Sequence, residues 1–150
     1  MKRLLILYAT QTGNTQEVAT ELYKKLSALF PEITFSLKNI TAVSVKDIIA
    51  IGQVILGAST WDENLNPDAD YFFSFVAKGN TNFSSCRFAL FGLGDRVFAD
   101  FCGAMPAIAQ ALTNRKATVY SPVFTMDGMP DDKKNSDLAA WAKEFLESLK

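Results

Sequence analysis

Histidine is absent from this sequence of 150 residues. Without an imidazole, the chain cannot form a Ser-His-Asp triad, a Cys-His dyad or a zinc site that uses histidine. The two cysteines, Cys86 and Cys102, form no CxxC pair, and we predict two reduced thiols rather than a disulfide framework. We therefore expect no catalytic residues and no metal ligands, and we assign any redox chemistry to a bound cofactor.

Long apolar runs are also absent. The apolar run nearest the N-terminus, residues 4–9, is far too short to span a bilayer and ends at Thr10 without a small-residue cleavage site. The length suits one domain, so we predict a single domain over residues 1–150. We expect a cytoplasmic protein with no membrane or nucleic-acid partner.

The net charge of −1 hides an uneven distribution of charge. Segments 57–70, 92–104 and 126–137 together contain ten acidic and three basic residues, and the rest of the chain is net basic. Such a pattern favours electrostatic docking to another protein. Acidic residues are also common in turns and at helix starts, so the pattern does not decide the question alone.

Strands and helices are predicted to alternate along the chain. Apolar runs at 4–9, 53–58 and 87–91 indicate strands covered on both faces, as in a parallel sheet. Alternation over 33–38 indicates an edge strand, and the stretch 117–125, interrupted by Pro122, indicates the other edge.

Between these strands the spacing of apolar residues predicts helices. One has Val18, Leu22, Leu26 and Leu29 on one face and ends at Pro31. Others are expected over 68–78, through 101–112 and from about 131 to 149, whereas 41–51 fits one or two short turns. The sequence therefore predicts an α/β fold with a doubly wound, five-stranded parallel sheet.

Ligands of such sheets bind beyond the carboxyl ends of the strands, which draws attention to loops 10–15, 59–66 and 92–102. The first loop follows a buried strand and opens a helix, and it offers hydroxyls, an amide, a glycine and free backbone N–H groups. A phosphate group fits there, held by neutral donors, because the loop has no Lys or Arg. The competing interpretation is a capped helix start in a loop of ordinary polar residues, with no bound phosphate. Walker and G-x-G-x-x-G fingerprints are both missing.

Three motifs, each after a predicted buried strand, resemble those of the flavodoxin family. They are the loop from Thr10 to Thr15, the triplet Ser59-Thr60-Trp61, and the pair 91–95 (FGLGD) and 101–104 (FCGA). The similarity covers essentially the whole chain, and the length matches short-chain members. The resemblance implies strand order 2-1-3-4-5 in a three-layer sandwich, with FMN as the cofactor.

The resemblance also implies a role for each motif. The first loop would bind the FMN phosphate, Ser59 and Thr60 would line the ribityl side, and Trp61 and Phe98 would stack on the two ring faces. Backbone groups after the third buried strand, together with Cys102, would contact the pyrimidine edge. The full set of expected cofactor-binding residues is Thr10, Gln11, Thr12, Gly13, Asn14, Thr15, Ser59, Thr60, Trp61, Asp62, Leu93, Gly94, Asp95, Phe98, Phe101 and Cys102.

Three residues depart from the commonest family pattern. Asp62 follows Trp61 where glycine is usual, and a carbonyl turns most easily at glycine, so we expect weaker stabilisation of the one-electron-reduced flavin. Arg96 would place a cation near the ring edge, and Phe98 keeps a stacking surface without the usual tyrosine hydroxyl.

The implied function is low-potential transfer of one or two electrons between redox proteins by a monomer, with a flavodoxin- or ferredoxin-type reductase as donor and an unidentified acceptor enzyme. An FMN-dependent NAD(P)H or quinone reductase of the same fold is an alternative. A flavin-free regulator resembling a response regulator is another, although residues 8–10 (YAT) lack the acids that such proteins need after the first strand.

Overall fold

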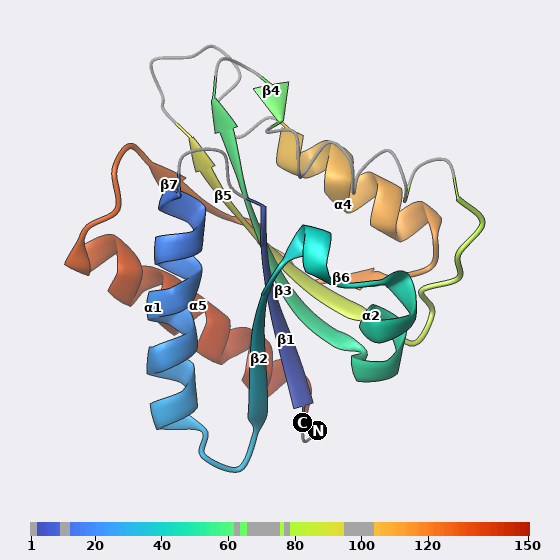
Figure 1. Cartoon of the computed structure of the whole chain (residues 1–150), viewed down its shortest axis with the longest axis horizontal. Coiled ribbons are helices and arrows are strands. Elements are labelled where there is room, and N and C mark those ends of the chain that lie inside the picture. Colours follow the sequence, from blue (N-terminus) through green and yellow to red (C-terminus); the bar gives the residue numbers. More distant parts are fainter. Residues whose placement is uncertain (1–2, 10–12, 62–63, 66–75, 77–78, 95–103) are drawn as a thin grey trace.

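The predicted buried strands form the centre of one parallel sheet (Figure 1). The computed structural model describes residues 3–9, 13–61, 64–65, 76, 79–94 and 104–150. Its strands are β1 (Arg3–Ala9), β2 (Thr34–Asn39), β3 (Gln53–Trp61), β4 (Asn64–Leu65), β5 (Arg87–Gly94), β6 (Thr118–Val119) and β7 (Phe124–Asp127).

The order of the sheet is β2-β1-β3-β5-β6, with β7 also paired to β5, and all of these pairs are parallel. This is the predicted order, because β6 and β7 together make up the last predicted strand. The two halves flank Pro122, which has no N–H to donate to a neighbouring strand. The short strand β4 pairs antiparallel with the end of β3 and was not predicted.

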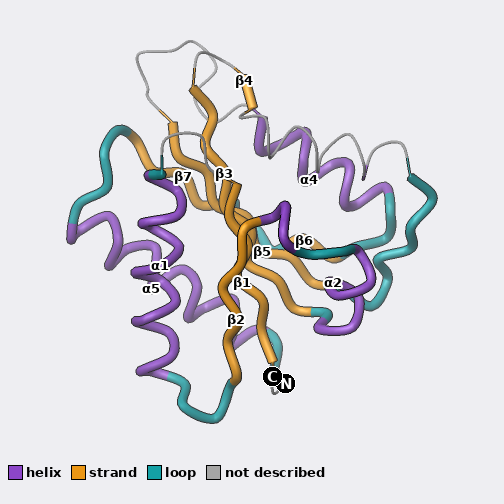
Figure 2. The backbone as a smooth tube through the Cα atoms, viewed as in Figure 1, coloured by secondary structure: helices purple, strands orange, loops and turns teal. Residues whose placement is uncertain are grey.

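Helices cover both faces of the sheet (Figure 2). Helices α1 (Asn14–Leu29) and α5 (Asp132–Ser148) pack on one face, and α2 (Val45–Ile51) and α4 (Ala104–Asn114) pack on the other. A single 3₁₀ turn, Ile40–Ala42, precedes α2, so the ambiguous stretch forms two short elements. The result is the doubly wound sheet predicted from the alternating pattern, in the three-layer sandwich that the resemblance implies.

Local sequence explains where the helices begin and end. Ser44 and Asp47 form a capping box at the start of α2, and Gly52 ends it in the left-handed region with φ of 83°. The Asp131 side chain caps α5 by accepting a hydrogen bond from the Lys134 N–H. The caps at Ser44 and Asp131 therefore mark where α2 and α5 begin.

Helix α1 corrects one detail of the prediction. Val18, Leu22 and Leu26 are buried against the sheet as expected, but Leu29 is 56% exposed. The helix ends at Leu29, and Phe30 fills the core at that position instead. The helix predicted over 68–78 lies outside the described residues except for Val76, which is helical and buried.

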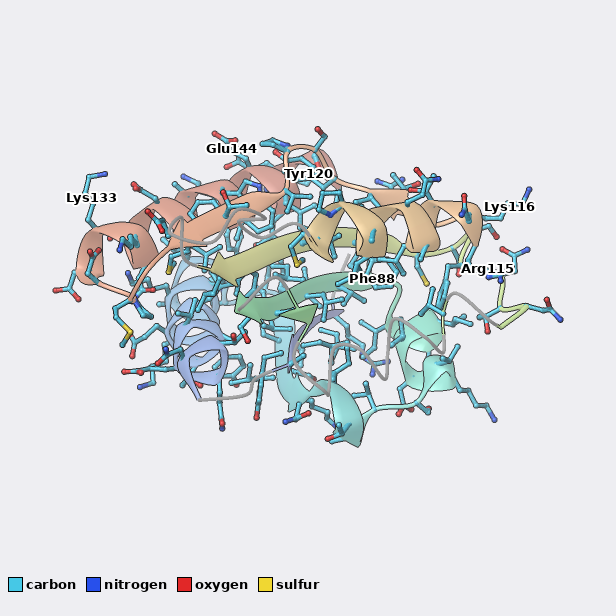
Figure 3. All side chains as sticks on the ribbon, turned by 90° about the horizontal axis from the view of Figure 1, so that it is seen from above. Phe88, Arg115, Lys116, Tyr120, Lys133 and Glu144 are labelled. Carbon is cyan, nitrogen blue, oxygen red and sulfur yellow. The ribbon has the colours of Figure 1, made fainter. Side chains whose placement is uncertain are left out.

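The middle of the sheet has a close contact that only glycine permits. Gly57 on β3 is paired with Phe91 on β5, and a Cβ at Gly57 would lie 2.0 Å from the Phe91 Cζ atom. Phe91 is fully buried and packs in the core between the sheet and helices α1 and α5. Phe88, also on β5, lies inside the molecule on the other face of the sheet. Lys133, on α5, points away from the molecule (Figure 3).

Candidate functional site

The register of the sheet brings the ends of four strands to one edge. Ala9, the last residue of β1, pairs with Ala58, and Ala58 pairs in turn with Gly92. Gly94, at the end of β5, pairs with Asp127 of β7. The three loops singled out in the sequence therefore all begin at this edge, which lies at the top of Figure 1. Open parallel sheets bind their ligands at this edge, which we call the ligand edge.

Helix α1 begins at this edge, immediately after the first loop. Gly13 precedes the helix with φ of 94°, a left-handed conformation that favours glycine. A glycine has no side chain with which to cap the helix, and the Gly13 carbonyl accepts the first helical hydrogen bond from the Glu17 N–H at 3.0 Å. An α-helix offers the N–H groups of its first turn no partner within the helix, so those of Asn14 and Thr15 can donate to an anion.

Thr15 gives this helix start an unusual feature. Its side chain is fully buried, and its Oγ1 atom has no hydrogen-bond partner among the described residues. A buried hydroxyl without a partner costs about 1–3 kcal/mol, so such groups are rare in folded proteins. For comparison, the Thr20 hydroxyl on the same helix donates to the Gln16 carbonyl at 2.7 Å. This hydroxyl, beside the backbone N–H groups of the first helical turn, indicates a binding site for an acceptor such as a phosphate oxygen.

The end of β3 supplies the second part of the site. Ser59 is buried, with 2% of its surface exposed, and pairs with Leu93 of β5. The backbone of Thr60 and Trp61 continues the strand and pairs with Leu65 and Asn64 of β4. The short β3–β4 hairpin therefore holds the backbone of the expected ring-stacking tryptophan at the ligand edge.

The end of β5 supplies the third part. Leu93 is fully buried, and the Gly94 carbonyl accepts a hydrogen bond of 2.7 Å from the Gly128 N–H. This bond ties β5 to the connection between β7 and α5. That connection also reaches α1, because the Asn14 Nδ2 atom lies 3.7 Å from the Met129 Sδ atom. The connection was not predicted as part of the site, because nothing in its sequence marks it as a ligand loop.

The structure brings together the described members of the expected site: Gly13, Asn14, Thr15, Ser59, Leu93, Gly94 and the backbone of Thr60 and Trp61. The remaining members, and the departure at Arg96, lie outside the described residues. These are Thr10, Gln11, Thr12, Asp62, Asp95, Phe98, Phe101 and Cys102.

The described titratable groups with shifted pKa values lie elsewhere in the fold. Burial raises the pKa of the Cys86 thiol, which is free and lies just before β5, at the opposite end of that strand from Gly94. Hydrogen bonds with Ser44 lower the pKa of Asp47, in α2. Among the described residues no cluster of acids and cysteines is suited to a metal ion. The described helices include none that is long and apolar enough to cross a membrane.

A polar cleft of about 160 Å³ lies beside the edge strand β2, away from the three loops. Ser36 and Lys38 of β2 line it together with Asp47 of α2. No described side chain in this cleft has an orphaned buried atom, whereas the start of α1 has one at Thr15. The start of α1 is therefore the stronger candidate for an anion.

Comparisons with known proteins point to one family. The family model described as Flavodoxin matches residues 6–141. A flavodoxin of Maridesulfovibrio salexigens is 29% identical over 99% of this chain and 100% of its own length. The crystal structure of oxidised Flavodoxin 2 from Bacillus cereus is 25% identical and superposes with a TM-score of 0.84, covering 97% of this chain and 99% of that one.

A crystal structure of Fusobacterium nucleatum flavodoxin is described as bound to flavin mononucleotide. It covers 96% of this chain and 98% of its own chain, with 18% identity and a TM-score of 0.70. At that identity the similarity establishes a common fold.

Proposed function

This chain belongs to the flavodoxin family, and we propose that it carries one or two electrons at a time between redox proteins on a non-covalently bound FMN. When bound, FMN supplies all the redox chemistry, because its ring system accepts and releases electrons. The role of the protein is to hold the cofactor, orient it and adjust its environment. The observation that carries the proposal is the buried Thr15 hydroxyl at the start of α1, which has no hydrogen-bond partner among the described residues and lies where the resemblance implies a phosphate.

We assign the phosphate to the first turn of α1. The backbone N–H groups of Asn14 and Thr15 and the Thr15 hydroxyl would donate hydrogen bonds to it, aided by the positive end of the helix dipole. Gly13 would allow the close approach, because its left-handed conformation turns the chain into the helix without a side chain in the way. Thr10, Gln11 and Thr12 would complete the cradle.

We assign the rest of the cofactor to the other two loops. Ser59 and Thr60 would line the ribityl chain, Trp61 would stack on one ring face and Phe98 on the other. The backbone of Leu93, Gly94, Asp95 and Cys102 would contact the pyrimidine edge, with Asp62 and Phe101 beside the ring. The pairing of Ser59 with Leu93 supports this arrangement, because it puts the ends of β3 and β5, from which the two loops start, next to each other.

We further propose that the chain acts as a monomeric, single-domain carrier over residues 1–150 in the cytoplasm. Its donor would be a flavodoxin- or ferredoxin-type reductase and its acceptor a further redox enzyme. The acidic residues near the ligand edge, such as Asp127, Asp131 and Asp132, suit docking to a basic partner surface.

An anaerobic reduction experiment separates this carrier from an FMN-dependent NAD(P)H reductase of the same fold. We expect NADPH alone to leave the visible spectrum of the FMN-loaded protein unchanged. Addition of a catalytic amount of flavodoxin reductase should then bleach the flavin band. Rapid bleaching by NADPH without the reductase would contradict the carrier role and favour the enzyme.

A further inference from the structure

The connection between β7 and α5, residues 128–131, is fastened to the ligand edge through Gly128 and contacts the start of α1 through Met129. At its start the Gly128 N–H donates to the Gly94 carbonyl at 2.7 Å, beside the register pair of Gly94 and Asp127. Gly128 adopts φ of 73°, which favours glycine and turns the chain sharply away from β7. The position of the connection is therefore tied to β5.

The connection then contacts the start of α1. The Asn14 side-chain amide donates to the Met129 Sδ atom at 3.7 Å, although the two residues are 115 positions apart in the sequence. A thioether is a weak acceptor, and Met129 is 64% exposed, so burial does little to hold this side chain in place. A separate contact is needed to fix the position of Met129.

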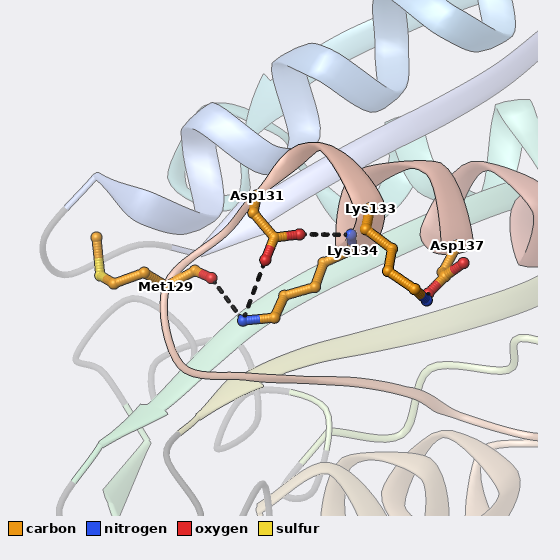
Figure 4. A network of polar contacts seen from close by, with 5 residues as sticks. All are labelled: Met129, Asp131, Lys133, Lys134 and Asp137. Atoms are coloured by element: carbon orange, nitrogen blue, oxygen red, sulfur yellow. Dashed lines mark hydrogen bonds and ion pairs between the residues drawn. The ribbon is translucent and has the colours of Figure 1, made fainter.

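Lys134 supplies that contact (Figure 4). Its Nζ atom donates to the Met129 carbonyl at 2.8 Å and lies 3.7 Å from an Asp131 carboxylate oxygen. The Asp131 carboxylate also caps α5 by accepting from the Lys134 N–H at 2.8 Å. Lys134 therefore links the first turn of α5 to Met129, and Met129 links it to Asn14.

The neighbouring lysine behaves differently. The Lys133 side chain is 84% exposed and pairs with Asp137 at 3.1 Å along the helix surface, whereas the Lys134 side chain is 35% exposed. Among the described residues, the contacts of Lys133 do not reach the connection. The two adjacent lysines thus share a helix, a charge and a length, but only one of them holds Met129.

We propose that Lys134 is a positioning residue for the FMN phosphate, acting through Met129 on Asn14 at the start of α1. This inference rests on the proposed function, because Asn14 is one of the residues that we assign to the phosphate. The expected phosphate loop contains no Lys or Arg, so precise placement of neutral donors has to replace a direct charge. Lys134 provides the placement from outside the loop.

The test compares the binding of FMN and of riboflavin, which lacks the phosphate, to four apoproteins: wild type, Lys134→Ala, Lys134→Arg and Lys133→Ala. Because Lys134 acts on the phosphate only indirectly, through Met129 and Asn14, we expect a dissociation constant for FMN that is about fivefold higher in Lys134→Ala, less than the loss of a direct charged hydrogen bond would give. The dissociation constant for riboflavin should change by less than about twofold, because the contact acts only on the phosphate end. Lys134→Arg should restore most of the FMN affinity, and Lys133→Ala should match wild type.

An NMR measurement on the cofactor-free proteins tests the mechanical link itself. The side-chain amide signals of Asn14 should shift in Lys134→Ala and in Met129→Leu, and should stay in place in Lys133→Ala. This readout needs no FMN, so it separates the failure of the link from failure of the proposed function.

Three results would overturn the inference and leave the proposed function standing. Equal losses of FMN and riboflavin affinity in Lys134→Ala would indicate a general structural effect. Unchanged affinity for both ligands would remove the positioning role. Unmoved Asn14 signals would show that Lys134 does not act through Met129. Wild-type protein that bound no FMN would refute the proposed function, and the positioning role would fall with it.

Discussion

Replacing Thr15 by valine should raise the stability of the apoprotein and lower its affinity for FMN. Valine keeps the branched shape of threonine and removes only the hydroxyl. That hydroxyl is fully buried and has no partner among the described residues, so the apoprotein bears its desolvation cost without compensation. Removing it should raise the free energy of unfolding by about 1 kcal/mol.

The effect on binding has the opposite sign. In the FMN complex the Thr15 hydroxyl would donate to a charged phosphate oxygen, and hydrogen bonds to charged groups contribute about 1.5–3 kcal/mol. Its loss should raise the dissociation constant for FMN by about 10- to 100-fold. Thr15→Ser keeps a hydroxyl and should retain most of the affinity.

Two assays check both signs. Urea unfolding of the apoproteins gives the change in the free energy of unfolding, and quenching of FMN fluorescence gives the dissociation constant. Thr20→Val is the matched control, because it makes the same change on the same helix at a hydroxyl that already donates to Gln16. It should lose a little stability and leave FMN affinity unchanged. A Thr15→Val protein that is destabilised, or that binds FMN as wild type does, would refute the reasoning.

Further predictions concern the fold around the site. Gly57→Ala should lower the free energy of unfolding by about 2–3 kcal/mol, because the new Cβ overlaps the buried Phe91 ring. Adding Phe91→Leu to the same chain should recover part of this loss, and an additive double-mutant cycle would contradict the overlap. The pKa of Asp47 is lowered by its hydrogen bonds with Ser44. The carboxylate therefore contributes fully to the free energy of unfolding above its ordinary pKa of 3.8, and this contribution is lost as the pH falls through the lower pKa of the folded state. The unfolding free energies of wild type and Asp47→Asn should therefore differ more at pH 7 than at pH 2, and a constant difference would argue against the pKa shift. In a Cys102→Ser background, burial and the raised pKa of Cys86 predict that its thiol reacts with a disulfide reagent only after unfolding, and rapid labelling of the native protein would contradict its placement.

The sheet was predictable because its central strands are continuous apolar runs. Residues 4–9, 54–58 and 88–91 lie in strands covered on both faces and are almost all buried, so consecutive apolar residues rather than a periodic pattern mark them in the sequence. The edge positions of β2 and of the last predicted strand could also be predicted locally, because alternation marks β2 and Pro122 marks the last strand. The exposure of Leu29 was not predictable from the period, because it depends on where the helix ends relative to Phe30.

The site could be predicted only where binding an anion requires particular residues close together in the sequence. The turn at Gly13 and the polar start of α1 can be seen in the sequence, because an anion site needs a glycine and free N–H groups there. The contacts of Met129 and Lys134 could not be seen in this way. The contact between Asn14 and Met129 joins residues 115 positions apart, and methionine and lysine have no motif of their own in such a connection.

A titration of the ¹⁵N-labelled apoprotein with FMN, followed in its amide NMR spectrum, tests most directly that the cofactor phosphate binds at the start of α1. The spectra should saturate at one FMN per chain, with the largest shifts at Gly13, Asn14 and Thr15 and further shifts at Ser59 and Gly94. No saturable change, or shifts centred on Ser36, Lys38 and Asp47 beside β2, would contradict it.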